Sequence, residues 1–292
     1  MDLGTYGVMV FTDGLSPEQM TELGRRTEKL GYKTLWYPEV YDYEAMVQGA
    51  FLLSQTSTLI VANGIANIYA RDAMAAAQGY NALNKLYNNR FVLGLGVSHP
   101  AMLEVRGGDH VFGKPVPTMR KYLDDMDKAW EVLGGPFNGE KNLVLAALGP
   151  GLQKLAAERT LGAMPYNYTP EMTASARQTL GADALLVAEQ KVCFTTDADK
   201  ARAAARRSLG FYLTFPRYHQ LWSGIGFNED DWSNGGSDRL MDAMVAWGSA
   251  EDIHGRLKAH LDAGADQVGI QSLRPEGGIG PDWNALEALA PN

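Results

Sequence analysis

FVLGLGV, residues Phe91–Val97, is apolar on both faces of an extended chain. A strand with one face in water alternates apolar and polar residues, whereas helices cover both faces of a strand in a parallel sheet. The preceding segment, Asp72–Tyr87, has the composition and period of a helix. The two segments together predict one strand–helix unit of a helix-covered parallel sheet.

Seven further segments have the same apolar character and alternate with helical segments. The first helix is marked at its start by Ser16-Pro17, an N-cap serine before a first-turn proline, and at its end by Gly31. With Phe91–Val97 as the fourth, the predicted strands are Tyr6–Phe11, Thr34–Glu39, Leu59–Ile65, Leu143–Ala147, Gly162–Asn167, Leu185–Cys193 and Gln267–Ser272. Eight such units in 292 residues predict an α/β fold, a (β/α)8 TIM barrel forming a single domain over residues 1–292. The alternative is an open doubly wound sheet.

Two connections are longer than a strand–helix unit needs, and they predict extended loops after strands four and seven. They span residues 98–117 and 209–237. Both follow strands at the edge where barrel active sites form. The aromatic residues of the second suit an apolar substrate wall, although packing against the barrel rim would explain them equally well.

Composition excludes several classes of protein. Hydrophobic residues make up 46% of the chain, which excludes disorder, and the net charge of −8 without a basic stripe argues against a nucleic-acid groove. The lone Cys193 permits no disulfide framework, and neither a signal peptide nor a membrane span is evident. We therefore expect a cytoplasmic protein with no membrane partner. The histidines lack metal-ligand spacing, so no metal site is expected.

The best local candidate for a ligand site is Gly149-Pro150-Gly151, at the junction of strand five and the next helix. Glycine lets a backbone approach a ligand closely, proline suits the first helical turn, and the unpaired N–H groups of that turn favour an anion such as phosphate. An ordinary turn has the same residues, so the motif alone does not settle the matter. In strand three, Gly64 between Asn63 and Asn67 indicates a bulge or a close approach to a flat ligand, or simply a polar strand end.

Two titratable residues end predicted strands and are the catalytic candidates. His99 follows strand four, where alternate glycines leave space at the barrel mouth, and imidazole titrates near neutrality. Glu39 ends strand two beside aromatic residues, where a carboxylate could bind a ligand or transfer a proton. A hydrogen-bonded loop histidine and an ion-paired rim carboxylate are the alternatives.

Four segments in this order resemble the bacterial luciferase-like superfamily of flavin and deazaflavin oxidoreductases. They are LGYKTLWYPE, ANGIANIYARD, NRFVLGLGVSH and LGPGLQKLAAE, beginning at residues 30, 62, 89 and 148. The resemblance covers essentially the whole chain. Its detail is most similar to the branch that uses coenzyme F420, a 5-deazaflavin hydride carrier.

The resemblance implies a role for each matching residue. It implies a non-proline cis peptide between Gly64 and Ile65 behind the deazaflavin ring. The remaining cofactor contacts that it implies are Asn67, the backbone of Val97 and Ser98, the phosphate loop at Leu148, Gly149 and Gly151, and the acidic position Glu39.

The chain also departs from the sugar-phosphate dehydrogenases of that branch. Val40 stands where they have a catalytic histidine, and His99 stands where they have a glutamate after strand four. The resemblance therefore implies an F420-dependent oxidoreductase with a different small organic substrate, with His99 or Glu39 handling the proton. Homodimers are common in the family, so we expect one here.

Two alternatives stay open. One is an FMN-dependent monooxygenase supplied by a separate flavin reductase, and the other is a non-catalytic flavin-binding barrel. Because FMN lacks the acidic polyglutamate tail of F420, basic residues along the cofactor's exit path would favour F420. The candidates are Arg71, Arg106 and Lys114.

Overall fold

The computed structural model describes residues 1–107 and 110–291. Eight parallel strand positions close into a barrel, and we call each position a stave, so that β3 and β4 together form one stave. The order around the barrel is β10-β1-β2-β3-β5-β6-β7-β8, and pairing of β8 with β10 completes the ring. The strands are β1 (Tyr6–Met9), β2 (Thr34–Tyr37), β3 (Ile60–Asn63), β4 (Ala66–Asn67), β5 (Phe91–Gly96), β6 (Leu143–Leu145), β7 (Gly162–Ala163), β8 (Leu185–Cys193), β9 (Val245–Trp247) and β10 (Gln267–Ser272). The predicted TIM barrel is confirmed, and the open sheet is wrong because the two edge strands meet.

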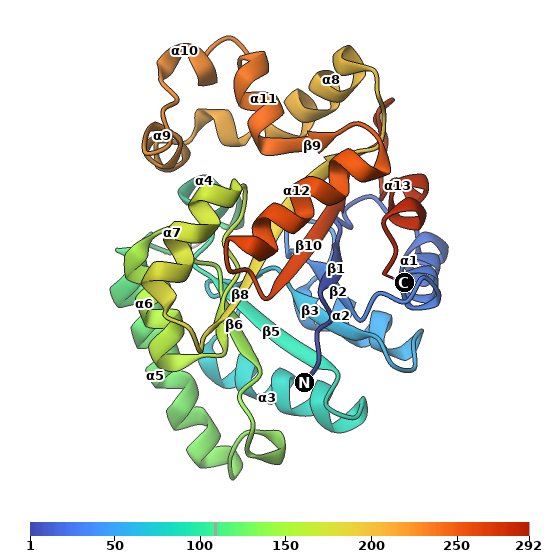
Figure 1. Cartoon of the computed structure of the whole chain (residues 1–292). Coiled ribbons are helices and arrows are strands. Elements are labelled where there is room, and N and C mark those ends of the chain that lie inside the picture. Colours follow the sequence, from blue (N-terminus) through green and yellow to red (C-terminus); the bar gives the residue numbers. More distant parts are fainter. Residues whose placement is uncertain (108–109, 292) are drawn as a thin grey trace.

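Helices surround the barrel (Figure 1). They are α1 (Pro17–Lys29), α2 (Ala45–Ser54), α3 (Ala73–Leu86), α5 (Pro115–Leu133), α6 (Pro150–Arg159), α7 (Pro170–Leu180), α12 (Ala250–Asp262) and α13 (Trp283–Ala288). The predicted start and end signals of α1 are both present. Ser16 forms a capping box with Gln19, and Gly31 after the helix has φ +84°. Local cap chemistry therefore sets the bounds of this helix.

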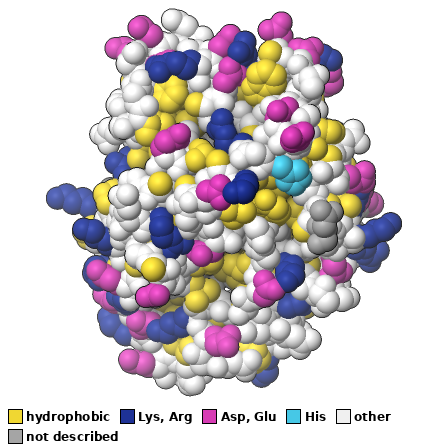
Figure 2. Space-filling model, in the orientation of Figure 1, with side chains coloured by type: hydrophobic (Ala, Val, Ile, Leu, Met, Phe, Trp, Pro, Cys, Tyr) yellow, Lys and Arg dark blue, Asp and Glu magenta, His cyan; other side chains and the backbone are white. Residues whose placement is uncertain are grey.

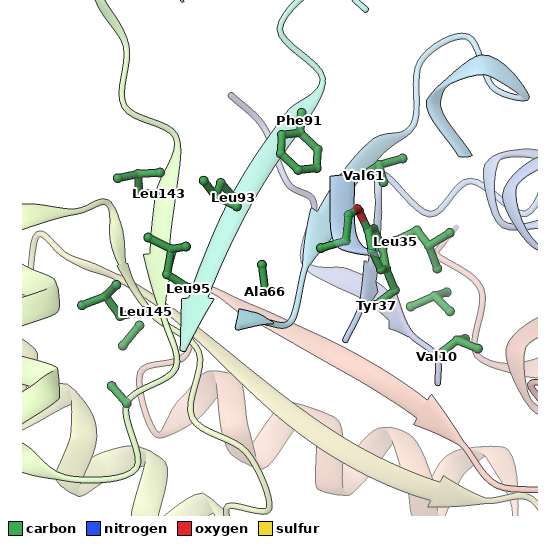
Figure 3. Packing of buried hydrophobic residues seen from close by; sticks show 14 of the residues in the cluster. Val10, Leu35, Tyr37, Val61, Ala66, Phe91, Leu93, Leu95, Leu143 and Leu145 are labelled. Atoms are coloured by element: carbon green, nitrogen blue, oxygen red, sulfur yellow. The ribbon is translucent and has the colours of Figure 1, made fainter. Parts of the chain in front are cut away.

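The period of two along each strand builds two apolar layers. Alternate strand residues such as Val8, Leu35 and Leu93 point outward into the core shared with the helices. Figure 3 shows part of that layer, and the ladder sets Leu93 of β5 opposite Leu143 of β6. The residues between them fill the barrel interior, among them Met9, Trp36, Ala62, Val92 and Val144. Both faces are buried, which explains why the strands read as continuous apolar runs.

The third stave is shorter than predicted, because a bulge at residues 64–65 separates β3 from β4. The peptide bond between Gly64 and Ile65 is cis, as the resemblance implied. Main-chain bonds fix the bulge to the end of β2: Gly64 N–H donates to the Tyr37 carbonyl at 2.7 Å, and Glu39 N–H donates to the Ile65 carbonyl at 2.9 Å. Leu59–Ile65 is therefore not one continuous strand.

Gly94 is required by the close approach of this neighbouring stave. A Cβ atom on Gly94 would lie 1.8 Å from the Asn63 carbonyl oxygen, a backbone atom that cannot rotate away. We expect Gly94→Ala to lower the free energy of unfolding by about 2 kcal/mol, as overpacking in rigid cores does. Chemical denaturation measures this loss. Gly255→Ala is the matched control, because its Cβ would meet nothing within 4 Å. Equal stability of the two variants would contradict the prediction.

Both connections are long, as predicted, and short helices lie within each of them. Apart from residues 108–109, which lie outside the described residues, the first contains α4 (Pro100–Arg106) and the start of α5. The second contains the 3₁₀ turn η2 (Tyr212–Thr214), α9 (Pro216–Ser223) and α10 (Glu229–Trp232). Proline in the first turn starts α4, α5 and α9, and Asn228 forms a capping box for α10. These signals are local and mark the starts of the short helices within the connections.

A layer that we call the cap, residues 198–244, lies beyond the C-terminal ends of the strands (Figure 1). It comprises α8 (Ala198–Leu209), η2, α9, α10 and α11 (Asp238–Met244) and has its own apolar cluster, which also buries Cys193. The unpredicted β9 follows it and pairs with the end of β8. The cap thus covers the barrel edge where the sequence places the active site.

The face of the molecule in Figure 2 carries positive and negative side chains interspersed, with no region covered by one sign alone. Within the described part of the chain, no helix has the length and apolar character to cross a membrane.

Candidate active site

The predicted site residues end four neighbouring staves, β2, β3–β4, β5 and β6. Because parallel strands finish at one edge, residues far apart in the chain meet there. The cap contacts the same edge through two of its residues: Phe215 stacks on His99 after β5, and Arg217 donates a hydrogen bond to the Leu148 carbonyl after β6. The fold therefore assembles the predicted residues into one region.

Glu39 is a buried ion-pair partner. Its carboxylate accepts hydrogen bonds from Arg71 Nη1 at 3.0 Å and from the Asn67 main-chain N–H at 2.8 Å. The side chains of Glu39 and Arg71 are 4% and 8% exposed, and Arg106 Nη2 lies 3.8 Å from Glu39. Burial is the largest single influence and opposes the charge on Arg71, but the hydrogen bonds and negative charges of Glu39 and Glu44 together outweigh it and raise the arginine pKa. This geometry favours Glu39 as the group that holds the β4 segment in place.

The bulge after β3 fills the space that the alternate glycines of β5 leave. A Cβ on Gly96 would lie 2.6 Å from Ile65 Cδ1, so the Ile65 side chain occupies that position. Asn67 is buried, and its side-chain oxygen accepts the Tyr69 N–H at 2.9 Å. Ile65 therefore forms part of the floor of the barrel mouth, while the Asn67 side chain closes its own turn.

His99 lies between the end of β5 and the cap. Ser98 before it has φ +58°, an uncommon left-handed conformation for serine that turns the chain sharply out of the strand. The imidazole stacks on Phe215 with ring centroids 3.5 Å apart and meets Phe211 edge-on at 6.4 Å. Its Nδ1 is buried without a hydrogen-bond partner among the described residues. Burial lowers the pKa of His99, so the ring is neutral at pH 7.

The predicted phosphate loop begins α6 with Gly149 as N-cap and no capping side chain. Its first-turn N–H groups are thus left for another acceptor. Arg217 Nη2 donates to the Leu148 carbonyl at 3.0 Å, and a Cβ on Gly149 would lie 1.9 Å from that nitrogen. A Cβ on Gly151 would lie 2.9 Å from Val116, so the start of α5 lies beside the start of α6.

Two groups of residues at this edge were not predicted. Arg217 is one, because only the folded cap brings it to the loop after β6. The other is the pair Glu189 and Lys191 of β8, both 1% exposed, with Nζ 3.1 Å from the glutamate and 3.8 Å from the centre of the Tyr166 ring. Burial lowers the pKa of Lys191. Charges at alternate positions of an apolar strand were a signal for this inward-facing pair.

A cavity of about 460 Å³ opens at the ends of β1 and β10. Its walls include Phe11, Tyr166, Phe211 and Tyr212. A larger hollow of about 760 Å³ lies at the opposite end of the barrel, between Met1–Tyr6 and Asn142. Active sites of such barrels lie at the C-terminal edge of the strands. The smaller cavity is therefore the candidate for binding a ligand.

These features define a parallel α/β-barrel protein with a candidate ligand site under a helical cap. Residues 2–267 match the model of the family described as luciferase-like monooxygenase. The chain therefore belongs to the luciferase-like monooxygenase family and is an enzyme of the luciferase-like type.

Individual relatives are distant. A Mycobacterium tuberculosis protein described as a coenzyme F420-dependent oxidoreductase is 25% identical over 254 residues, covering 73% of this chain and 71% of the relative. The structure of the coenzyme F420-dependent tetrahydromethanopterin reductase from Methanopyrus kandleri is similar with a TM-score of 0.76 and 19% identity, covering 98% of this chain and 97% of the other. The FMN complex of a type II Baeyer–Villiger monooxygenase from Pseudomonas putida has a TM-score of 0.72 and 14% identity, with 99% and 97% covered. At such identities the structural likenesses show the fold alone.

Proposed function

We propose that the protein is an F420-dependent oxidoreductase that transfers a hydride between C5 of the deazaflavin and a small organic substrate. The observation that carries the proposal is the start of α6, which lacks a capping side chain and lies beneath the guanidinium of Arg217. Helix N–H groups and a nearby cation are what a phosphate group requires. The M. tuberculosis relative supports the choice of cofactor.

The residues present fit such a cofactor along its length. Leu148, Gly149 and Gly151, together with Arg217, would hold the phosphate. Ile65 of the bulge and the backbone of Val97 and Ser98 would lie against the ring, with Asn67 beside it. When bound, the deazaflavin would supply the hydride chemistry, and the protein would supply orientation and electrostatics.

His99 is the better placed of the two candidates for proton transfer. Its neutral imidazole has a free ring nitrogen, whereas both oxygens of Glu39 are engaged by Arg71. We propose that His99 exchanges the proton that accompanies hydride transfer. Glu39 would position the β4 segment. The homodimer stays a prediction.

Two of the three basic residues predicted for the acidic tail support the choice of F420 over FMN. Arg71 is buried and paired with Glu39 and Glu44, so it is not available for an acidic tail. Arg106 is partly exposed, and the exposed Lys114 is the N-cap of α5, the helix that begins beside the phosphate loop. These two residues are the candidates that the structure leaves for the polyglutamate tail.

We expect F420 to bind at least about tenfold more tightly than FMN, a difference of roughly 1.4 kcal/mol. Titration of each cofactor against tryptophan fluorescence measures both affinities. Substituting Arg106 and Lys114 together by glutamine should weaken F420 binding and leave FMN binding unchanged. Equal affinity for the two cofactors, or stoichiometric FMN in the purified protein, would favour the monooxygenase instead. A bound cofactor that no substrate can oxidise or reduce would favour the non-catalytic carrier.

A further inference from the structure

The cavity at the ends of β1 and β10 combines an aromatic wall with a basic rim. Phe11, Tyr166, Phe211 and Tyr212 form the wall, and Tyr166 packs against Phe11 and Tyr212 with ring centroids 6.3 and 5.4 Å apart. Its volume of about 460 Å³ lies within the range of pockets that bind small molecules. Rings of this kind favour a flat apolar ligand.

Two arginines, Arg207 of α8 and Arg274 after β10, line the same cavity. Among the described residues, neither guanidinium has a carboxylate oxygen within 4.0 Å. Their hydrogen bonds go to main-chain carbonyls: Arg207 Nη2 donates to Pro275 at 2.7 Å, and Arg274 Nε donates to Pro281 at 3.1 Å. Neither guanidinium is therefore paired with a carboxylate among the described residues.

Asp13, the one acidic side chain among the described residues that line the cavity, does not neutralise this pair. Its carboxylate accepts the main-chain N–H of Tyr41 at 3.0 Å and that of Asp42 at 3.4 Å. The lining therefore carries two positive side chains against one carboxylate that is already engaged. A ligand with its own carboxylate would supply the missing charge.

A glycine-rich turn holds the two arginines at the rim. Gly277 and Gly278 have φ of +83° and +109°, where side-chain-bearing residues are strained. A Cβ on Gly277 would lie 3.3 Å from Arg207 Nε, and one on Gly278 would lie 3.7 Å from Arg274 Nη1. The turn thus packs directly against both guanidinium groups and fixes where their charges lie.

We propose that this cavity binds a small aromatic carboxylate, with its ring against the aromatic wall and its carboxylate on Arg207 and Arg274. The inference rests on the proposed function in one respect: it names the substrate class of that oxidoreductase. Phe211 links the two sites, because it lines the cavity and also contacts the His99 ring. A ligand in the cavity lies against the ring that touches the proton-handling histidine.

Binding of trans-cinnamate and of its neutral amide, trans-cinnamamide, tests the charge requirement, since the two have nearly the same shape. Isothermal titration of each into the full-length protein should show cinnamate binding at least about tenfold more tightly. The double variant Arg207→Gln, Arg274→Gln should lose that preference while keeping its affinity for cinnamamide. Arg120→Gln, which removes an exposed arginine of α5 paired with Glu158, is the matched control and should keep the preference.

Two further measurements make the outcome decisive. Phe211→Ala should weaken both ligands, because the aromatic wall serves both. Equal binding of the two ligands by the wild type, or a preference that survives in the double variant, would overturn the proposal. Titration with F420 is scored separately. Cinnamate preference without F420 binding would contradict the proposed function alone, whereas F420 binding without cinnamate preference would contradict this inference alone.

Discussion

Gly151→Asp is expected to weaken the binding of F420 at least about 100-fold, or roughly 2.7 kcal/mol. The substitution places a carboxylate in the first turn of α6, where the N–H groups have no capping side chain. That carboxylate would take the N–H groups for itself and repel a phosphate, and hydrogen bonds to charged groups contribute about 1.5–3 kcal/mol each. Fluorescence titration of the variant with F420 measures the loss, and FMN, which also carries a phosphate, should lose affinity alongside it.

Gly151→Ala isolates the charge from the added bulk. In both variants the new Cβ would lie 2.9 Å from Val116 Cγ2, so both pay the same packing cost. Thermal denaturation of the two free proteins should show similar losses of stability, and only the aspartate variant should lose most of its cofactor affinity. If the two variants bind F420 equally well, residues 149–151 form an ordinary turn and the phosphate lies elsewhere.

The barrel could be predicted from the sequence because its signals are local. An apolar run of strand length, a serine-proline N-cap and a glycine after the helix depend on neighbours within a few residues, and Ser16 and Gly31 behave in the structure as their types suggest. Parallel strands all end at one edge, so the barrel alone places His99, Glu39 and Gly149 together. The position of the candidate site therefore follows from the topology of the barrel.

The partners of those residues could not be predicted, because they depend on contacts over long separations. Arg217 is 69 residues from Leu148, the residue to which it donates. Glu39 and Arg71 are 32 residues apart, and nothing in either segment indicates that the carboxylate is buried against that arginine. The middle of the cap, residues 209–237, is predicted to be a loop because its helices are short and its aromatic residues follow no helical period. Its cluster around Leu209 and Trp222 becomes visible only after folding.

His99→Asn is expected to lower turnover by about 10²–10⁴-fold, the usual contribution of a positioned acid or base. Asparagine keeps a polar side chain of similar size but cannot exchange a proton near neutral pH. The affinity for F420 should change far less, because helix N–H groups and Arg217 would hold the cofactor. Stopped-flow measurement of F420 reduction and of its reoxidation, with an aromatic carboxylate that the wild type turns over, provides the rate.

The pH dependence separates proton transfer from a purely structural role of His99. If His99 handles the proton, its neutral imidazole accepts it when the substrate is oxidised, so the rate should be level at high pH and fall as the pH drops through the pKa of His99. Burial lowers that pKa, so the fall should lie below the ordinary value of about 6.5. This fall of the rate at low pH should vanish in His99→Asn. It should persist in His254→Asn, which removes an α12 histidine packed beside Tyr6. If His99→Asn turns over within about threefold of the wild type and its rate still falls at low pH, His99 is only a rim residue held by Phe215. A positioned acid or base contributes far more than threefold to the rate.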